Sequence, residues 1–225
     1  MAVSVIMPMY KPGRFIHEAI DSIVAEAKPG TEIIVVDDGS KDGTAESIEE
    51  RGFSNLLVLR QDNAGPASAR NFGLSHARGE FVAFLDADDM WLEGKLSIQL
   101  QIMVDHPYAD IVMGNTVGFG EDAEDGNQRF LANWESQQFL QLGSALVRRD
   151  VFDKAGMFDP SLRYAEDIDW FLRVREAGII IFEHTDPVLR YRRHKNNMTN
   201  NTDARDKGFV CALMKNLQRK RAQAH

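Results

Sequence analysis

Short apolar segments alternate with amphipathic segments through the first 106 residues, and this alternation constrains the fold more than any other feature. The apolar runs are VSVIM (3–7), EIIVV (32–36), NLLVL (55–59) and EFVAFL (80–85). Strands that are apolar on both faces, each followed by a helical pattern, predict an α/β fold with a mostly parallel sheet and helices on both faces. Right-handed crossovers then bring the loops after the strands to one edge of the sheet, where ligands bind.

The composition narrows the class of protein. The length of 225 residues predicts a single domain, and a formal net charge of −8 argues against a nucleic-acid partner. The one cysteine, Cys211, forms no internal disulfide, and no Cys/His cluster indicates zinc. No apolar stretch approaches the roughly 20 residues that a membrane span needs. We therefore expect a cytoplasmic protein, whether free or at the inner face of the membrane.

After Pro107 the alternation loosens. Three apolar segments predict strands: 109–114, 179–182 and 188–193. Two segments that end at glycine predict helices: 148–156 and 166–178. The acidic, glycine-rich stretch 118–128 predicts a mobile loop. The C-terminal helix carries an apolar stripe from Phe209 to Leu217, which we expect to dock on the body of the protein or on a second subunit.

Carboxylates close two of the predicted strands. VVDDGS ends the second strand with Asp37 and Asp38, and FLDADD ends the fourth with Asp86, Asp88 and Asp89. Residues i and i+2 of an extended strand point the same way, so we expect Asp86 and Asp88 to face one ligand. Mg²⁺ or Mn²⁺ suits such oxygen ligands and would offset the repulsion between them. The alternative is that the acids cap the following helices. Two acidic strand ends on one edge favour the metal site.

A calcium site is a further reading of the first acidic segment. Residues 38–49 match much of the spacing of an EF-hand loop. An EF-hand loop follows a helix, whereas this segment follows the apolar run EIIVV, so a turn and a helix cap are favoured for Ser40 and Asp42. The sequence contains neither a Walker A loop nor a G-x-G-x-x-G fingerprint. Phosphate charge would therefore be met by the metal and by scattered donors.

Five segments stand in the order seen in family 2 glycosyltransferases. They are VSVIMPMYKPGRFIHEAIDSI, EIIVVDDGSKDGT, NAGPASARNFGL, GEFVAFLDADD and GMFDPSLRYAEDIDWFLRV. The chain resembles this family over residues 3–199, which is nearly its whole length. The resemblance implies the glycosyltransferase-A fold, a Rossmann-like α/β single domain. It also implies a nucleotide-diphospho-sugar donor, a divalent metal (Mn²⁺ or Mg²⁺) and inversion at the anomeric carbon.

The resemblance assigns roles to residues that match the motifs of the family. Pro8, Met9 and Tyr10 would line the pocket for the base, and Asp38 would accept a hydrogen bond from the base, which is usually uracil. Asn63, Gly65 and Arg70 would lie near the nucleotide. Asp86 would reach the ribose or the metal. Asp88 would bind the metal that bridges the diphosphate, and His194 would approach the diphosphate or the metal. Asp167 would be the general base.

The acidic cluster AEDIDW (165–170) fits this chemistry from its residues alone. A positioned carboxylate can take the proton of an acceptor hydroxyl as attack develops. We expect Asp167 to be ionised at neutral pH, because backbone N–H groups at a helix start favour the charged form. Glu166 and Asp169 would support the acceptor site or only complement the helix dipole. Trp170 would either form the base of a sugar-binding site or, as we favour, pack in the core.

Two other function classes stay open at this point: a sugar nucleotidyltransferase and a non-catalytic nucleotide-sugar or metal-binding module. A nucleotidyltransferase normally carries a glycine-rich basic loop after the first strand, where this chain reads PMYKPGRF (8–15). The acidic cluster, far along the chain from the metal motif, favours chemistry over binding alone. QRFLANW (128–134) lacks the Gln-x-x-Arg-Trp pattern of processive synthases, so we expect single additions.

Within the domain, we expect residues 1–106 to bind the nucleotide, 107–200 to bind the acceptor and carry the catalytic group, and 201–225 to form the C-terminal helix. The sugar and acceptor contacts are expected in 115–141. The acceptor would be a saccharide or a lipid-linked molecule. The basic segments 190–195 and 218–225 would suit an anionic lipid surface, although solvated faces are the favoured interpretation.

Overall fold

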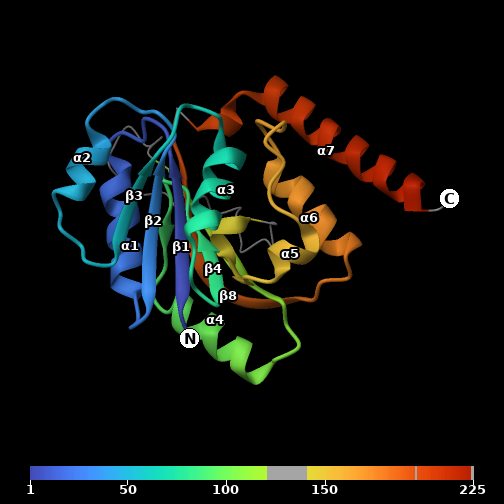
Figure 1. Ribbon diagram of the computed structural model, residues 1–225, viewed down its shortest axis with the longest axis horizontal. Helices are drawn as coiled ribbons and strands as arrows, with labels where there is room; N and C mark the ends of the chain where they lie inside the picture. The colour runs from blue at the N-terminus through green and yellow to red at the C-terminus, as the bar shows by residue number, and fades with distance from the viewer. Residues whose placement is uncertain (121–140, 196, 224–225) are drawn as a thin grey trace.

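The computed structural model describes residues 1–120, 141–195 and 197–223, which form one α/β domain with an eight-stranded sheet (Figure 1). The sheet order is β3-β2-β1-β4-β7-β6-β8-β5. Its strands are β1 (Val3–Met9), β2 (Thr31–Asp37), β3 (Leu56–Arg60), β4 (Phe81–Phe84), β5 (Met90–Trp91), β6 (Ile111–Gly120), β7 (Ala145–Arg148) and β8 (Ile181–Arg193). Its helices are α1 (Phe15–Glu26), α2 (Thr44–Glu49), α3 (Pro66–His76), α4 (Lys95–Asp105), α5 (Val151–Ala155), α6 (Glu166–Glu176) and α7 (Thr202–Gln223), with 3-10 turns η1 (Leu142–Ser144) and η2 (Met198–Asn200).

The N-terminal half has the predicted parallel arrangement. Strands β3, β2, β1 and β4 run parallel, with Val5 beside both Ile33 and Ala83. The C-terminal half is mixed, because β7 pairs antiparallel with β4 and β6, whereas β6 and β8 are parallel. The expectation of a mostly parallel sheet is therefore confirmed for the first half, and the complete sheet is mixed.

Helices cover both faces of the sheet, as predicted. Ile33 and Val35 of β2 belong to a core cluster with residues of α1, α2 and α4. Ile34 and Val36 belong to a second cluster with residues of α3, α5 and α6. The side chains of a strand alternate between its faces, so continuous apolar runs fill both layers. This rigid double layer fixes the strand ends from which the loops of the site emerge.

The C-terminal half differs in detail from the prediction. The segment 188–193 and the last two residues of the segment 179–182 belong to one strand, β8, and the short strands β5 and β7 were not predicted. The pairing of β6 with β8 shifts register around Asn115, which lies opposite Pro187. Proline has no N–H to give to the ladder, and an irregularity is where a strand tolerates it.

The backbone after β4 is also unlike the prediction. Strand β4 ends at Phe84, and Asp89 donates its backbone N–H to the Asp86 carbonyl at 3.1 Å. Residues 86–89 therefore form a turn, and the argument that Asp86 and Asp88 share one face of an extended strand is wrong. Three predictions fall largely outside the described residues. They are the mobile loop at 118–128, the sugar and acceptor contacts at 115–141, and the single additions inferred from 128–134.

Candidate active site

Loops at the carboxyl ends of the parallel strands meet at one edge of the sheet. The Lys11 backbone N–H, after β1, donates to Ser40 Oγ, after β2, at 2.9 Å. Gly39 has φ +81°, and a Cβ atom there would lie 3.0 Å from the backbone nitrogen of Asn63, after β3. Glycine accommodates both this conformation and this approach. The motif DDGS thus packs three strand-end loops together.

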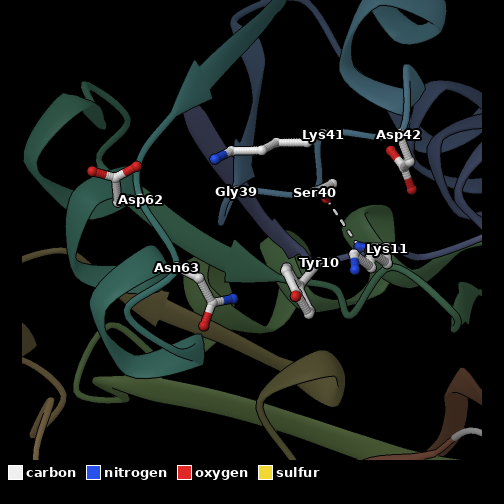
Figure 2. Close-up of a pocket in the computed structure, with 8 residues that line it drawn as sticks. All are labelled: Tyr10, Lys11, Gly39, Ser40, Lys41, Asp42, Asp62 and Asn63. Atoms are coloured by element: carbon white, nitrogen blue, oxygen red, sulfur yellow. Dashed lines mark hydrogen bonds between the residues drawn. The ribbon is translucent and has the colours of Figure 1, made fainter.

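A pocket of about 500 Å³ lies between these loops (Figure 2). It is lined by Tyr10, Lys11, Gly39, Ser40, Lys41, Asp42, Asp62 and Asn63. Figure 2 shows the Lys41 side chain extending toward the side of the pocket on which Asp62 and Asn63 lie. The half-exposed Tyr10 ring offers an aromatic face. The volume and this mixture of an aromatic ring, backbone and charged groups suit a small polar ligand.

Only one of the three residues expected around a base lines this pocket, namely Tyr10. Met9 is buried in the core cluster on one face of the sheet, because the strand continues through it. Pro8 is half-buried in the same strand and is not among the lining residues. Its burial excludes Met9 from a base pocket at this surface, whereas the role of Pro8 stays a prediction.

Asp38 orders the loop after β3. One carboxylate oxygen accepts from Gln61 Nε2 at 2.7 Å and from the Ala64 N–H at 2.8 Å. The other accepts from Asn63 Nδ2 at 3.1 Å and from the Gly65 N–H at 2.9 Å. A carboxylate has about four acceptor directions. All of them are used, so in this conformation Asp38 has no room to accept from a base, and its expected role of reading uracil directly is not the one seen.

Arg70 links the strand edge to the acidic cluster. Arg70 is a buried residue of α3. Its Nη2 donates to Asp86 Oδ1 at 2.7 Å, and its Nη1 donates to Glu166 at the start of α6. Burial would lower the pKa of Arg70, but Asp86 and Glu166 outweigh that effect and raise it. The Nε atom is buried and has no partner among the residues that the structure describes. A fixed positive charge thus lies between the two carboxylates.

Asp167 lies beside this ion pair in the first turn of α6. The residue before the helix start, Ala165, has φ +61°, a left-handed conformation that is uncommon for a residue other than glycine. Burial and the neighbouring Glu166 raise the pKa of Asp167 to about 7, against the opposing effects of Arg70 and the Ile168 N–H. The expectation of full ionisation at neutral pH is wrong, because desolvation outweighs the helix terminus. A carboxylate with this pKa is suited to accept a proton near neutral pH.

Asp88 and His194 come together from distant parts of the chain. His194 Nε2 lies 3.0 Å from Asp88 Oδ2, and Asn197 Nδ2 lies 3.4 Å from the same oxygen. The imidazole packs against the Phe15 ring, with centroids 4.9 Å apart. Burial and Asp86 raise the pKa of Asp88, whereas the hydrogen bond from His194 lowers it. The predicted proximity of Asp88 and His194 is therefore present in the structure.

Asp89 has an anchoring role that the sequence did not indicate. It is buried and accepts from the Arg192 N–H at 2.8 Å. Arg192 in turn donates from Nε to the Asp88 carbonyl at 2.8 Å and from Nη2 to Glu18 at 2.5 Å. The turn that carries Asp88 is thereby fastened to the end of β8 and to α1. The distance between these residues in the chain left no local pattern from which to predict this contact.

Two residues of the acidic cluster have structural roles. Asp169 is buried and accepts from Arg173 at 3.0 Å and from Arg219 of α7 at 2.9 Å. Trp170 is fully buried, donates from Nε1 to the Gly156 carbonyl at 3.0 Å and stacks on Phe152. Trp170 therefore packs in the core, as favoured, and neither it nor Asp169 is available to touch an acceptor.

The fit of a divalent cation depends on Asp88 and His194. Within the described residues, no three His, Cys, Asp or Glu side chains are arranged as a ready metal site. Asp88 Oδ2 and His194 Nε2 nevertheless form a carboxylate–imidazole pair at 3.0 Å beside the solvent-facing Asp86. Mg²⁺ typically binds through one or two carboxylates plus substrate phosphates. The residues present thus fit a cation that arrives with a diphosphate.

The sequence matches a known family over most of its length. Residues 4–165 match the family model for glycosyl transferase family 2. The chain belongs to this family. It is therefore a glycosyltransferase, which decides between the function classes left open by the sequence.

Curated relatives agree with this assignment. The chain is 30% identical over 213 residues to the Bacillus subtilis protein "Putative teichuronic acid biosynthesis glycosyltransferase TuaG", with 88% of this chain and 82% of that protein covered. It is 35% identical to glycosyltransferase GlyG of Streptococcus pneumoniae, covering 87% of this chain and 72% of that protein. It is 28% identical to an uncharacterized glycosyltransferase of Rickettsia typhi and spans 66% of its length, against 88% of this chain.

Solved structures show the same fold. S. aureus TarS 1-349 in complex with UDP superposes with a TM-score of 0.71 at 26% identity, over 86% of this chain and 61% of that one. The mannosyltransferase PcManGT from Pyrobaculum calidifontis, in complex with GDP-Man and Mn²⁺, superposes with a TM-score of 0.76 at 21% identity, over 96% of this chain and 64% of that one. The glycosyltransferase-A type of fold expected from the motifs is thereby confirmed.

Among the helices in the described ranges, none combines the length and apolar character needed to cross a lipid bilayer.

Proposed function

We propose that this glycosyltransferase moves one sugar at a time from a UDP-sugar to an acceptor hydroxyl, with inversion and with a divalent metal. The observation that carries the proposal is the ion network in which buried Arg70 joins the exposed Asp86, at the strand edge, to buried Glu166, the residue next to Asp167. It links the edge that we propose for the nucleotide to Asp167, a carboxylate whose pKa is raised to about 7. An inverting displacement requires this pairing of a bound leaving group with a base.

The nucleotide would occupy the 500 Å³ pocket and the adjoining edge. The Tyr10 ring provides a surface for the base, and Lys11 and Lys41 provide positive charge. Asn63 and Gly65 would act as part of the loop that Asp38 orders. The UDP bound to TarS, a protein 26% identical to this one, supports a uracil nucleotide. We assign nucleotide binding to residues 1–106 and acceptor binding to residues 107–200.

The proton of the acceptor hydroxyl would go to Asp167. The acceptor oxygen attacks the anomeric carbon from the side opposite the diphosphate, the new carbon–oxygen bond forms, and the bond to the phosphate oxygen breaks with its electron pair. Arg70 forms ion pairs with both Glu166 and Asp86. Asp167 would therefore be the carboxylate of this group that accepts the proton. Asp88 and His194 would hold Mn²⁺ or Mg²⁺, which when bound neutralises the charge of the leaving diphosphate.

The acceptor is proposed to be a saccharide or a lipid-linked saccharide of a cell-surface polysaccharide. The name of TuaG, 30% identical over most of both chains, supports this class. Incubation with a panel of UDP-, GDP- and CDP-sugars, with Mn²⁺ or EDTA, tests the proposal by following nucleotide release. We expect UDP release that depends on one UDP-sugar and on the metal. Metal-independent release, or a preference for GDP- or CDP-sugars, would contradict it.

A further inference from the structure

Large apolar and aromatic side chains gather in two places outside the two core clusters. One is the stripe of α7, whose five members are 37% to 57% exposed: Phe209, Val210, Leu213, Met214 and Leu217. The expectation that this stripe docks on the body of the protein is therefore wrong. The other is a row of aromatic rings and guanidinium groups that runs from the end of β6 to the proposed metal site.

Two phenylalanine rings, two arginine side chains and one imidazole form this cation–aromatic row. The guanidinium carbons of Arg190 and Arg192 lie 4.4 and 4.5 Å from the centroid of the Phe119 ring. The guanidinium carbon of Arg192 also lies 4.3 Å from the centroid of the Phe15 ring. That ring in turn packs against His194, with a centroid distance of 4.9 Å and an interplanar angle of 34°. The row therefore connects β6 and α1 with the segment that follows β8.

Arg192 is a buried cation, and the row helps to compensate its charge. Its exposed fraction is 5%. Its Nε donates to the Asp88 carbonyl at 2.8 Å, and its Nη2 donates to the Glu18 carboxylate at 2.5 Å. A guanidinium is weakly hydrated and is attracted to the negative face of an aromatic ring, so Phe15 and Phe119 can replace water around it. Without such neighbours, burial of the charge would be costly.

Phe15 contacts both of the side chains that hold Asp88. Arg192 binds the Asp88 carbonyl, and His194 Nε2 lies 3.0 Å from the Asp88 Oδ2 atom. The position of this one ring therefore bears on the backbone and on the carboxylate of the same residue. Among the described residues, the two core clusters include neither Phe15 nor Phe119, so the packing of helices on the sheet does not account for these rings.

We propose that Phe15 and Phe119 are positioning residues for Asp88 and His194. Both rings hold Arg192, which fixes the turn that carries Asp88, and Phe15 also orients the His194 imidazole. Because Asp88 and His194 are the proposed metal ligands, the consequence for donor binding rests on the proposed function. The π face of each ring is required, and apolar volume alone does not suffice, since the attraction to a cation comes from the ring quadrupole.

Exchange of the Arg192 Nε–H proton tests the proposal without metal or nucleotide. This proton is donated to the Asp88 carbonyl, and NMR follows its exchange with solvent in the full chain. Phe15→Leu and Phe119→Leu keep apolar volume but lose the π face, and each should speed the exchange by about tenfold or more. Phe15→Tyr keeps the π face and should exchange as wild type does.

Calorimetric titration of UDP in Mn²⁺ or in EDTA gives a second readout. In Mn²⁺, Phe15→Leu should weaken UDP binding by about tenfold, the effect of losing a group that supports a metal ligand, whereas Phe15→Tyr should stay within about threefold of wild type. Affinity in EDTA should be the same in all variants. Phe53→Leu is the matched control, because the half-buried Phe53 ring lies 4.7 Å from the Arg51 guanidinium in the loop before β3. It should change neither readout.

A Phe15→Leu variant that matches wild type in either experiment overturns the proposal. So does a Phe15→Tyr variant as impaired as Phe15→Leu, because the ring would then act by its shape alone. Phe15 is half-buried, so its variants decide the outcome if circular dichroism shows that Phe119→Leu does not fold. A wild type with equal UDP affinity in Mn²⁺ and EDTA would contradict the proposed function, and the exchange rates alone would then decide whether the rings position Asp88.

Discussion

His194 Nε2 lies 3.0 Å from Asp88 Oδ2, although 106 positions separate the two residues in the chain. The contact joins the turn after β4 to a segment that follows β8. Asn197 reaches the same carboxylate oxygen, so two side chains of one short segment are directed at Asp88. The site that we propose for the diphosphate and its metal would thus be completed only when the C-terminal part of the domain is in place.

Substitutions at this pair should make nucleotide binding insensitive to metal. Asp88→Asn and His194→Gln would each remove a proposed metal ligand. We expect UDP affinity in Mn²⁺ to fall by about 10- to 100-fold, because the loss of a group that supports a metal site lowers metal affinity by about this factor. Affinity in EDTA should be unchanged. Calorimetric titration of UDP with and without Mn²⁺ measures both. His76→Gln, on the exposed side of α3, is the control. Equal metal dependence in all three variants would argue against the assignment.

Asp167→Asn should impair turnover and spare binding. The amide keeps the shape of the side chain but cannot take the proton, and loss of a general base typically costs about 10²–10⁴-fold in rate. UDP affinity depends on the other half of the site and should change less than threefold by the same reasoning. Steady-state turnover and UDP titration are to be compared directly. Near-normal turnover, or a loss explained by weaker UDP binding, would exclude Asp167 as the base.

The pH dependence of wild-type activity should follow the ionisation of Asp167. Only the ionised carboxylate accepts a proton, so kcat/KM should rise with pH through about 7, the raised pKa of this group. Glu166→Gln removes a like charge and should move this limb to lower pH. Arg70→Gln removes a stabilising positive charge and should move it to higher pH. Opposite shifts are the decisive result. Shifts in the same direction would mean that another group controls the profile.

Asp38→Ala should destabilise the loop after β3 and weaken the binding of all nucleotides to a similar extent. Four donors would lose their acceptor, and a buried unsatisfied donor costs about 1–3 kcal/mol. We expect a lower melting temperature and similar losses of UDP and CDP affinity. Asp42→Ala, on the exposed side of the same pocket, controls for the local charge. A selective loss of UDP would mean that Gln61 or Asn63 gives way to the base and that Asp38 reads uracil after all.

Arg219→Met should loosen the helix that carries Asp167. The change leaves one buried oxygen of Asp169 without its partner and removes the contact with Glu176, so we expect a loss of about 1–3 kcal/mol in the free energy of unfolding. Chemical denaturation measures this loss, and hydrogen exchange should show faster opening in α6. Arg205→Met, an exposed arginine of the same helix, should change neither. Unaltered exchange in α6 would show that α7 is not needed to hold it.

The first half of the fold could be predicted because its information is local. Runs such as EIIVV are apolar on both faces, and only a sheet covered by helices on both sides buries them fully. The sequence alone also predicts that the motif DDGS lies at the end of the second strand. The resemblance to the family placed Asp88 at the metal and His194 near the diphosphate or the metal, which no local pattern contains.

The remaining features depend on contacts between distant segments. Strands β5 and β7 are too short to carry a pattern, and their partners determine that they form. The turn at 86–89 is held by Arg192, more than 100 positions away, so strand periodicity misplaced Asp86 and Asp88. The pKa of Asp167 was misjudged because a helix start is visible in the sequence, whereas burial beside Glu166 is visible only in the fold.

The parallel strands β1 to β4 have a consequence for engineering. Every loop around the pocket belongs to one uninterrupted stretch that ends before Pro107, so the donor site could be exchanged between relatives as a single cassette. Among the described residues, the side-chain links that cross the junction include Arg70 to Glu166, Asp89 to Arg192 and Asp88 to His194. A chimera that preserves these links should keep its acceptor while adopting the nucleotide preference of the donated segment.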